Sequence, residues 1–174
     1  MLTEPPRHMV SGEVIDTIAL ISWPMERLSE SIASPKQRLE LMRISPERMD
    51  MIDSINILWM NPKKESIARI IEISKVTGDI AGLSGVDIDV LALALENNYS
   101  LITDDYRMQN VAEYMEMEWF PVNTEGIKKI WKWEIICRGC KKIQQNPESP
   151  YKNKDEIGDC VDCGLELKMR KVRL

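Results

Sequence analysis

Residues 101–110 read LITDDYRMQN, and this stretch decides the fold. Its first two residues are apolar, as in a short buried strand, and a pattern typical of a helix begins at Tyr106. A strand that passes through a polar turn into a helix is the repeating unit of an α/β sheet. The turn contains two adjacent aspartates, Asp104 and Asp105, whose like charges repel each other. They form either a turn with a helix cap or half of a metal site.

The same alternation of strand and helix extends in both directions along the chain. Continuous apolar runs between polar turns are typical of buried parallel strands, and Ser45 and Ser84 stand where helix N-caps belong. The sequence predicts strands at 13–21, 55–60, 99–103 and 117–122. It predicts helices at 24–33, 35–42, 63–76, 83–98 and 106–115, and a further helix that begins at Pro46. Such alternation indicates an α/β domain with a central parallel sheet.

Three aspartates, Asp16, Asp104 and Asp105, lie where such a sheet places its chemistry, and the sequence alone does not place a fourth, Asp87, relative to that edge. Asp16 lies within or just past the first strand, Asp104 and Asp105 follow the strand at 99–103, and Asp87 opens the helix before it. Open α/β sheets bind ligands outside the carboxyl ends of their strands. Ser84 and Asp87 also form a capping box, and Asp104 could cap the helix that follows it. A charge inside an apolar strand is costly unless it is paired, so Asp16 is harder to explain structurally. Acids gathered at one edge favour a divalent cation, Mg²⁺ or Mn²⁺.

All four cysteines lie near the C-terminal end, in two CxxC pairs separated by nineteen residues: Cys137, Cys140, Cys160 and Cys163. Two such pairs are typical of a four-cysteine zinc site, in which two tight turns complete a tetrahedron of thiolates. Because the protein supplies every ligand, the single zinc is predicted to be structural. Two disulfides are the alternative. A chain with no secretory signal and no other cysteine disfavours them.

The charge of the chain divides near residue 126. Residues 1–126 carry 11 Lys and Arg against 21 acids, a net charge of −10, whereas residues 127–174 carry 12 against 7, a net charge of +5. The split predicts two modules, an acidic domain over 1–126 and a basic cysteine-containing module over 127–174. The final stretch, LELKMRKVRL, predicts a strand with one apolar face and one mostly basic face.

The basic module is suited to RNA. Lysines and arginines interleaved with aromatic residues such as Trp131 and Trp133 favour phosphate contacts together with base stacking. The predicted RNA-contacting residues are Lys128, Lys129, Lys132, Arg138, Lys141, Lys142, Lys168 and Arg170, joined by Lys36 and Arg38 from the acidic domain. The alternative is a solvated basic face with the tryptophans packed on the acidic domain.

Other classes of protein are disfavoured by what the sequence lacks. It has no glycine-rich phosphate loop and no GxGxxG, so no nucleotide cofactor is expected. His8 is the sole histidine, so Ser-His-Asp and Cys-His schemes lack their base. The longest apolar run, 90–95, is far shorter than the ~20 residues of a membrane helix, and the N-terminal stretch is unlike a secretory signal. We therefore expect a soluble, cytoplasmic protein.

Four features together resemble the archaeal NIN-one-binding endonuclease: the aspartate in an early apolar strand, LSGVDIDVLALALE at 83–96, LITDDYRMQNVAEYM at 101–115, and the four-cysteine segment. That family joins a PIN nuclease domain to a zinc ribbon. The resemblance implies a three-layer PIN domain with a central parallel sheet, followed by a small C-terminal ribbon. It also implies an endoribonuclease that uses Mg²⁺ or Mn²⁺. Its implied substrate is the 3′ end of small-subunit ribosomal RNA in the pre-ribosomal particle, with assembly-factor proteins as further partners.

The resemblance carries the metal-binding acids of the family onto Asp16, Asp87 and Asp105, with Asp104 as an outer acid. Supporting residues from the same motif are Thr103, which would orient the site, and Gln109 and Asn110, which would shape the loop.

The fourth acid of the family is a glutamate, and in this chain Ser31 stands in its register. Glu30 lies one residue earlier, a shift that rotates a helical side chain by ~100°. Either Glu30 serves, or Glu26 reaches from one turn earlier, or the site holds three acids. A three-acid site favours a non-catalytic RNA-binding scaffold of ribosome assembly with a degenerate nuclease site. A toxin-type PIN ribonuclease is a further alternative, which the zinc ribbon and the QNVA motif disfavour.

Overall fold

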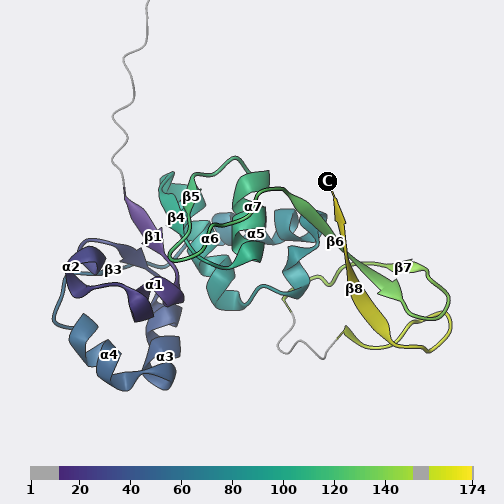
Figure 1. Cartoon of the computed structure of the whole chain (residues 1–174), viewed down its shortest axis with the longest axis horizontal. Coiled ribbons are helices and arrows are strands. Elements are labelled where there is room, and N and C mark those ends of the chain that lie inside the picture. Colours follow the sequence, from purple (N-terminus) through teal and green to yellow (C-terminus); the bar gives the residue numbers. More distant parts are fainter. Residues whose placement is uncertain (1–11, 151–156, 174) are drawn as a thin grey trace, which may run out of the picture.

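A computed structural model describes residues 12–150 and 157–173 of the chain. A five-stranded parallel sheet lies at the centre of the first part, with strand order β3-β2-β1-β4-β5. The second part is a three-stranded antiparallel sheet of order β7-β6-β8, which extends away from the first (Figure 1). The predicted α/β class with a central parallel sheet is confirmed. No helix in the described ranges is long and apolar enough to cross a membrane.

The strands of the parallel sheet are short. Their bounds are β1 Glu13–Ile15, β2 Ile32–Ala33, β3 Leu58–Trp59, β4 Ser100–Ile102 and β5 Trp119–Phe120. Side chains along each strand alternate between two cores, as the pleat requires. Val14, Ile32 and Leu101 face one core, and Ile15 and Ile102 face the other. Both faces of the sheet are therefore buried, which explains the continuous apolar runs of the sequence.

Helices cover each face and complete a three-layer domain (Figure 1). One core packs against α5 Lys64–Thr77, α6 Gly85–Asn97 and α7 Tyr106–Tyr114. The other packs against α1 Thr17–Ser22, α2 Met25–Leu28, α3 Pro35–Ile44 and α4 Pro46–Ile52. A short 3₁₀ turn, η1 Asp79–Ala81, joins α5 to α6 and was not predicted.

Two predicted elements were wrong. The run 13–21 is a strand only as far as Ile15, because Asp16 accepts a hydrogen bond from the Thr17 backbone N–H and caps α1. The predicted helix at 24–33 ends at Leu28, and residues 32–33 instead form β2. Between them Glu30 has a φ of 66°, a left-handed conformation that interrupts a helix.

The second sheet consists of β6 Trp131–Cys137, β7 Ile143–Gln144 and β8 Leu167–Arg173. Its long strand β6 passes so close to α5 that a Cβ on Gly78 would lie 1.9 Å from the Trp133 carbonyl oxygen. Gly78 also has a φ of 78°, which favours glycine at the C-terminal end of α5. The predicted strand in 165–174 is confirmed as β8. The predicted division of the chain at residue 126 stays a prediction.

Candidate active site

Asp16 and Asp105 lie at the carboxyl ends of β1 and β4, which are paired neighbours in the parallel sheet. The buried hydroxyl of Thr103 donates to Asp16 Oδ2 at 2.7 Å and accepts the Asp105 backbone N–H at 3.0 Å. One threonine thus joins the ends of both strands. Burial raises the pKa of Asp16 to about 6; the Thr103 hydrogen bond opposes the rise, and the charges of Asp87 and Asp105 add to it.

Asp87 reaches this edge from the first turn of α6. It forms the capping box that the sequence predicts: the Ser84 backbone N–H donates to Asp87 Oδ2 at 2.6 Å, and Ser84 Oγ accepts the Asp87 N–H at 3.1 Å. Burial raises the pKa of Asp87 to about 6, with the Ser84 hydrogen bonds acting against the rise and the charges of Asp105 and Glu40 increasing it. The cap and the acid cluster are therefore compatible roles for this one residue.

Glu40 on α3 completes the cluster, and the sequence analysis did not find it. Its Oε2 accepts a hydrogen bond from the Thr17 hydroxyl at 2.7 Å, next to Asp16 on the chain. Its charge contributes to the raised pKa of Asp87. A sequence signal did exist, since Glu40 is the only acid in the helix predicted at 35–42.

The structure does not bring Glu30 to the cluster, and Glu26 is exposed in the first turn of α2. Glu30 precedes β2, and its backbone N–H donates to the Asn56 carbonyl at 2.7 Å. Its cavity is lined by Glu13 and Ser100, which begin β1 and β4. Because the strands are parallel, Glu30 lies at their amino ends, across the sheet from Asp16. The choice of Glu30 as the fourth acid is thus corrected.

The two adjacent aspartates of the turn have different partners. Asp105, not Asp104, caps α7, since its Oδ1 accepts the Arg107 N–H at 2.7 Å. Asp104 Oδ1 instead accepts backbone N–H groups of Val122 and Thr124 in the loop after β5. These and related hydrogen bonds outweigh burial and lower the pKa of Asp104. The predicted capping role of Asp104 is therefore wrong, and its carboxylate is used to hold a loop.

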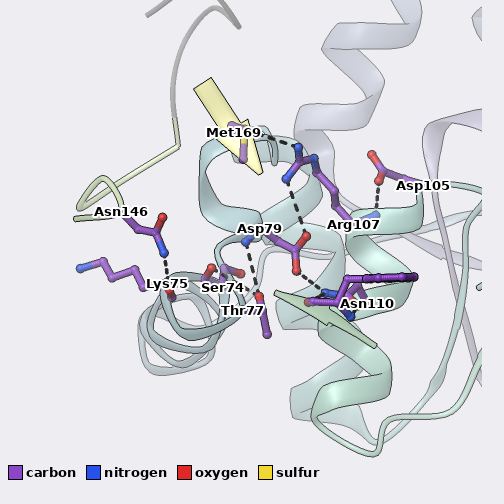
Figure 2. Close-up of polar contacts among 10 residues, drawn as sticks. Ser74, Lys75, Thr77, Asp79, Asp105, Arg107, Asn110, Asn146 and Met169 are labelled. Carbon is purple, nitrogen blue, oxygen red and sulfur yellow. Dashed lines mark hydrogen bonds and ion pairs between the residues drawn. The ribbon is translucent and has the colours of Figure 1, made fainter. Parts of the chain in front are cut away.

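Gln109 and Asn110 lie buried on α7, where they connect the two sheets. The Gln109 amide donates to the Thr103 carbonyl at 2.8 Å and accepts the Ile127 N–H at 3.0 Å. The Asn110 amide pairs with both backbone groups of Trp131 at 2.7 Å, and also donates to Asp79 Oδ2 at 2.7 Å (Figure 2). Gln109 and Asn110 therefore fix the chain where it leaves the domain of the parallel sheet and enters β6.

The four cysteines converge, with their sulfurs all within 4.8 Å of one another. Sγ of Cys137 lies 3.4 Å from that of Cys163, and Sγ of Cys140 lies 3.6 Å from that of Cys160. These distances exceed a disulfide bond of about 2.05 Å. They approach the ~3.8 Å edge of a tetrahedron with metal–sulfur bonds of about 2.3 Å. The cluster therefore fits zinc, and the donors match a closed structural site.

The predicted RNA-contacting residues are spread over several surfaces. Lys36 pairs with the buried Asp89 at 2.8 Å and shares a face of α3 with Glu40. Arg38 points elsewhere and pairs with Asp53. Four basic residues of the second module form exposed ion pairs with neighbouring acids: Lys128, Arg138, Lys142 and Arg170. Lys141 donates to the Arg138 carbonyl, and Lys129, Lys132 and Lys168 lie on or beside β6 and β8.

Comparisons with known proteins agree with this architecture. Residues 14–96 match the family model described as the PIN domain of ribonuclease. The chain is 35% identical over 165 residues to Endoribonuclease Nob1 of Methanocaldococcus jannaschii, covering 92% of this chain and 78% of that protein. It is 35% identical over 120 residues to Nob1 of Pyrococcus abyssi, covering 68% and 69%. It is also 34% identical over 157 residues to Ribonuclease VapC1 of Thermoplasma acidophilum, covering 89% and 76%. With its PIN fold and four-cysteine cluster, the chain belongs to the Nob1 family of PIN-domain endoribonucleases.

Proposed function

We propose that this chain is a metal-dependent endoribonuclease that matures the 3′ end of small-subunit ribosomal RNA in the pre-ribosomal particle. The observation that carries the proposal is the gathering of Asp16, Glu40, Asp87 and Asp105 at the carboxyl edge of the parallel sheet. The similarity to endoribonucleases of the Nob1 family supports the reaction class. The LSGVD and QNVA motifs carry the resemblance to the archaeal NIN-one-binding endonuclease family, and that resemblance supports small-subunit ribosomal RNA as the substrate.

The residues of this edge fit a divalent cation. Asp16 is buried and Asp87 is half-buried, and the pKa of each is raised by loss of solvent and by the charges of neighbouring acids, so a positive charge at this place would be stabilising. Their donors are carboxylate oxygens, which Mg²⁺ and Mn²⁺ prefer. Asp16, Asp87, Asp105 and Glu40 would hold the ion. When bound, it supplies charge neutralisation at the phosphate and lowers the pKa of a coordinated water.

The chain itself supplies orientation. Asp87, Asp105 and Glu40 each use one carboxylate oxygen in a hydrogen bond to the protein. Within the described ranges, the second oxygen of each has no such partner and stays available to a ligand. Thr103 fixes Asp16 relative to the backbone of Asp105. These contacts hold the acids in place before substrate binds, which is the arrangement that electrostatic catalysis requires.

The proposed reaction is hydrolysis. A water oxygen forms a bond to phosphorus while the bond from phosphorus to the 3′ oxygen breaks in line with it. The leaving oxygen takes a proton and becomes a 3′-hydroxyl, and the phosphate remains on the 5′ end of the downstream fragment. An acidic domain repels RNA, so the grip on the substrate comes largely from the basic module over 127–174, held in shape by one zinc.

The test is a cleavage assay with Mn²⁺ or Mg²⁺ on RNA that spans the end of small-subunit ribosomal RNA. Wild type should cleave once, and Asp105→Ala and Glu40→Gln should lower the rate by at least about 100-fold, because each acid belongs to one constellation. Glu30→Gln is the matched control and should cleave at the wild-type rate. If Glu40→Gln cleaves at the wild-type rate and Glu30→Gln loses cleavage, then Glu30 and not Glu40 is the fourth acid of the site. A wild type that binds this RNA but never cleaves it would support the scaffold alternative.

A further inference from the structure

A cavity of about 220 Å³ lies where α7 meets the antiparallel sheet. Its walls include Tyr106 from α7, Trp131 and Trp133 from β6, and Lys171 from β8. A cavity of about 150 Å³ holds benzene in other proteins. The present cavity therefore has room for one flat heterocycle.

Cations and aromatic rings alternate around this cavity. Lys171 Nζ lies 4.1 Å from the centre of the Trp131 ring, and the Arg107 guanidinium lies 4.4 Å from the Trp133 ring. Tyr106 is 57% exposed, although it is a large aromatic residue on a helix. Trp131 and Trp133 are half-buried, so the alternative that they simply pack on the acidic domain describes only part of their surface.

Lys171 departs from the pattern of its strand. On β8, Leu167 and Met169 form the apolar face, and Lys171 continues that face beside Trp133, its cross-strand neighbour. None of the ion pairs within residues 12–150 and 157–173 includes Lys171. An ammonium group without an acidic partner, between two tryptophans, is suited to an anionic ligand with a flat ring.

The cavity adjoins the acid cluster through α7. Tyr106 directly follows Asp105, and Tyr106, Arg107 and Trp133 also line a second cavity of about 580 Å³. Asp105 and the cations Arg138 and Lys168 also line that second cavity. In Figure 2, Arg107 extends from α7 toward Met169 of β8 and Asp79 of η1, and so forms part of the wall between the two cavities.

We propose that the smaller cavity binds one unpaired nucleobase of the RNA, next to the phosphate that is cleaved. The base stacks on Tyr106 and the tryptophans, and Lys171 contacts the adjoining phosphate. The Asn110 amide lines the cavity, but both of its N–H groups are used by Trp131 and Asp79, so it has no donor left for a base edge. Binding is therefore tolerant of base identity. This inference rests on the proposed function for the position of the scissile phosphate.

The experiment measures RNA affinity in zinc-loaded protein without added Mg²⁺ or Mn²⁺, so that binding is separated from cleavage. The probe is a single-stranded RNA with the sequence of the small-subunit rRNA end, and a series in which each position in turn is abasic. Wild type should lose about tenfold in affinity at one position next to the cleavage site, the effect expected of one stacked base. Replacement of that base by any of the other three should have little effect.

Tyr106→Ala should bind the intact RNA about tenfold more weakly and show no further loss with the abasic probe, because the contact is already gone. Lys171→Gln should weaken binding to intact RNA and reduce its salt dependence. Tyr114→Ala, an exposed tyrosine on the same helix outside this cavity, is the matched control and should keep the wild-type abasic profile.

A wild type without an abasic penalty at any position overturns the proposal, and so does an equal penalty in wild type and Tyr106→Ala. Cleavage with Mn²⁺ is assayed separately on the same RNA. Cleavage without an abasic penalty would reject the nucleobase site and leave the nuclease function standing. An abasic penalty without cleavage would reject the nuclease function and leave a site that binds one nucleobase.

Discussion

Replacing Asp16 by asparagine should make the protein more stable while it abolishes cleavage. Asp16 is 8% exposed and its carboxylate lies among other acids. Asparagine has nearly the same shape and also caps helices well, so the α1 N-cap is retained. The change removes a buried negative charge that has no cation beside it when Mg²⁺ and Mn²⁺ are withheld, and it also removes the oxygen that accepts the Thr103 hydroxyl.

The size of the effect follows from the pKa. Burial raises the pKa of Asp16 from 3.8 to about 6. Since one pKa unit corresponds to 1.36 kcal/mol, ionised Asp16 lowers the free energy of unfolding by about 3 kcal/mol at pH 7. Below pH 3.8 the acid is neutral in both folded and unfolded chains and the cost is absent. The cost grows as the pH rises from 3.8 to about 6, and it is constant above.

The assay is urea denaturation of zinc-loaded protein without Mg²⁺ or Mn²⁺, at pH 7 and near pH 4. Asp16→Asn should gain up to about 3 kcal/mol at pH 7 and only about 0.5 kcal/mol near pH 4. Asp104→Asn is the control with the opposite sign, because hydrogen bonds lower the pKa of Asp104 and its ionised form stabilises the fold at pH 7. A loss of stability in Asp16→Asn at pH 7 would refute the reasoning, since the carboxylate would then be stabilising in the absence of metal.

Two further predictions concern the zinc cluster and the close contact between Gly78, at the end of α5, and β6. Cys140→Ser should reduce bound zinc from about one ion per chain to none in metal analysis of the purified protein, because one of four thiolates is lost; retention of a full zinc would contradict the site. Gly78→Ala should lower the free energy of unfolding by more than about 2 kcal/mol, since its φ is 78° and the new Cβ would lie 1.9 Å from the Trp133 carbonyl. Gly85→Ala, where nothing lies within 4 Å of the new Cβ, should be neutral or slightly stabilising in the same denaturation series.

The parts of the fold that depend on local signals were predicted well from sequence. The capping box at Ser84 and the proline after Ser45 each act within one turn of chain, and the structure has helix boundaries at both. The boundary after Ile15 was missed because it depends on a distant strand. The Asp16 backbone N–H donates to the Ile102 carbonyl, after which the chain turns into α1. Apolar composition alone cannot distinguish this short strand and helix from one long strand.

In the candidate site, too, some residues are placed by sequence order alone and others only by tertiary packing. Asp16 and Asp105 follow apolar strands of a parallel sheet, so sequence order alone places them at one edge. Glu40 has no such marker: it lies in the middle of α3, and only the packing of α3 against α1 brings it to Thr17. Counting residues from the family pattern led to Ser31, and Glu30 was considered because it lies one residue earlier in a range, 24–33, that was predicted to be one helix. The strand β2 within that range moves Glu30 to the opposite edge of the sheet.

The stretch 101–110 connects the site with the second module more closely than its sequence suggests. Within ten residues it supplies Asp105 to the acid cluster, Tyr106 and Arg107 to both cavities, and Asn110 to the first residue of β6. Most of these residues belong to α7, a single helix of nine residues, whose internal hydrogen bonds keep their relative positions. A shift of β6 against α7 would therefore move the cavities relative to Asp105. The antiparallel sheet is thus positioned by the same helix whose N-cap is a proposed metal ligand, so the proposed nucleobase cavity and the proposed site of cleavage share one rigid element.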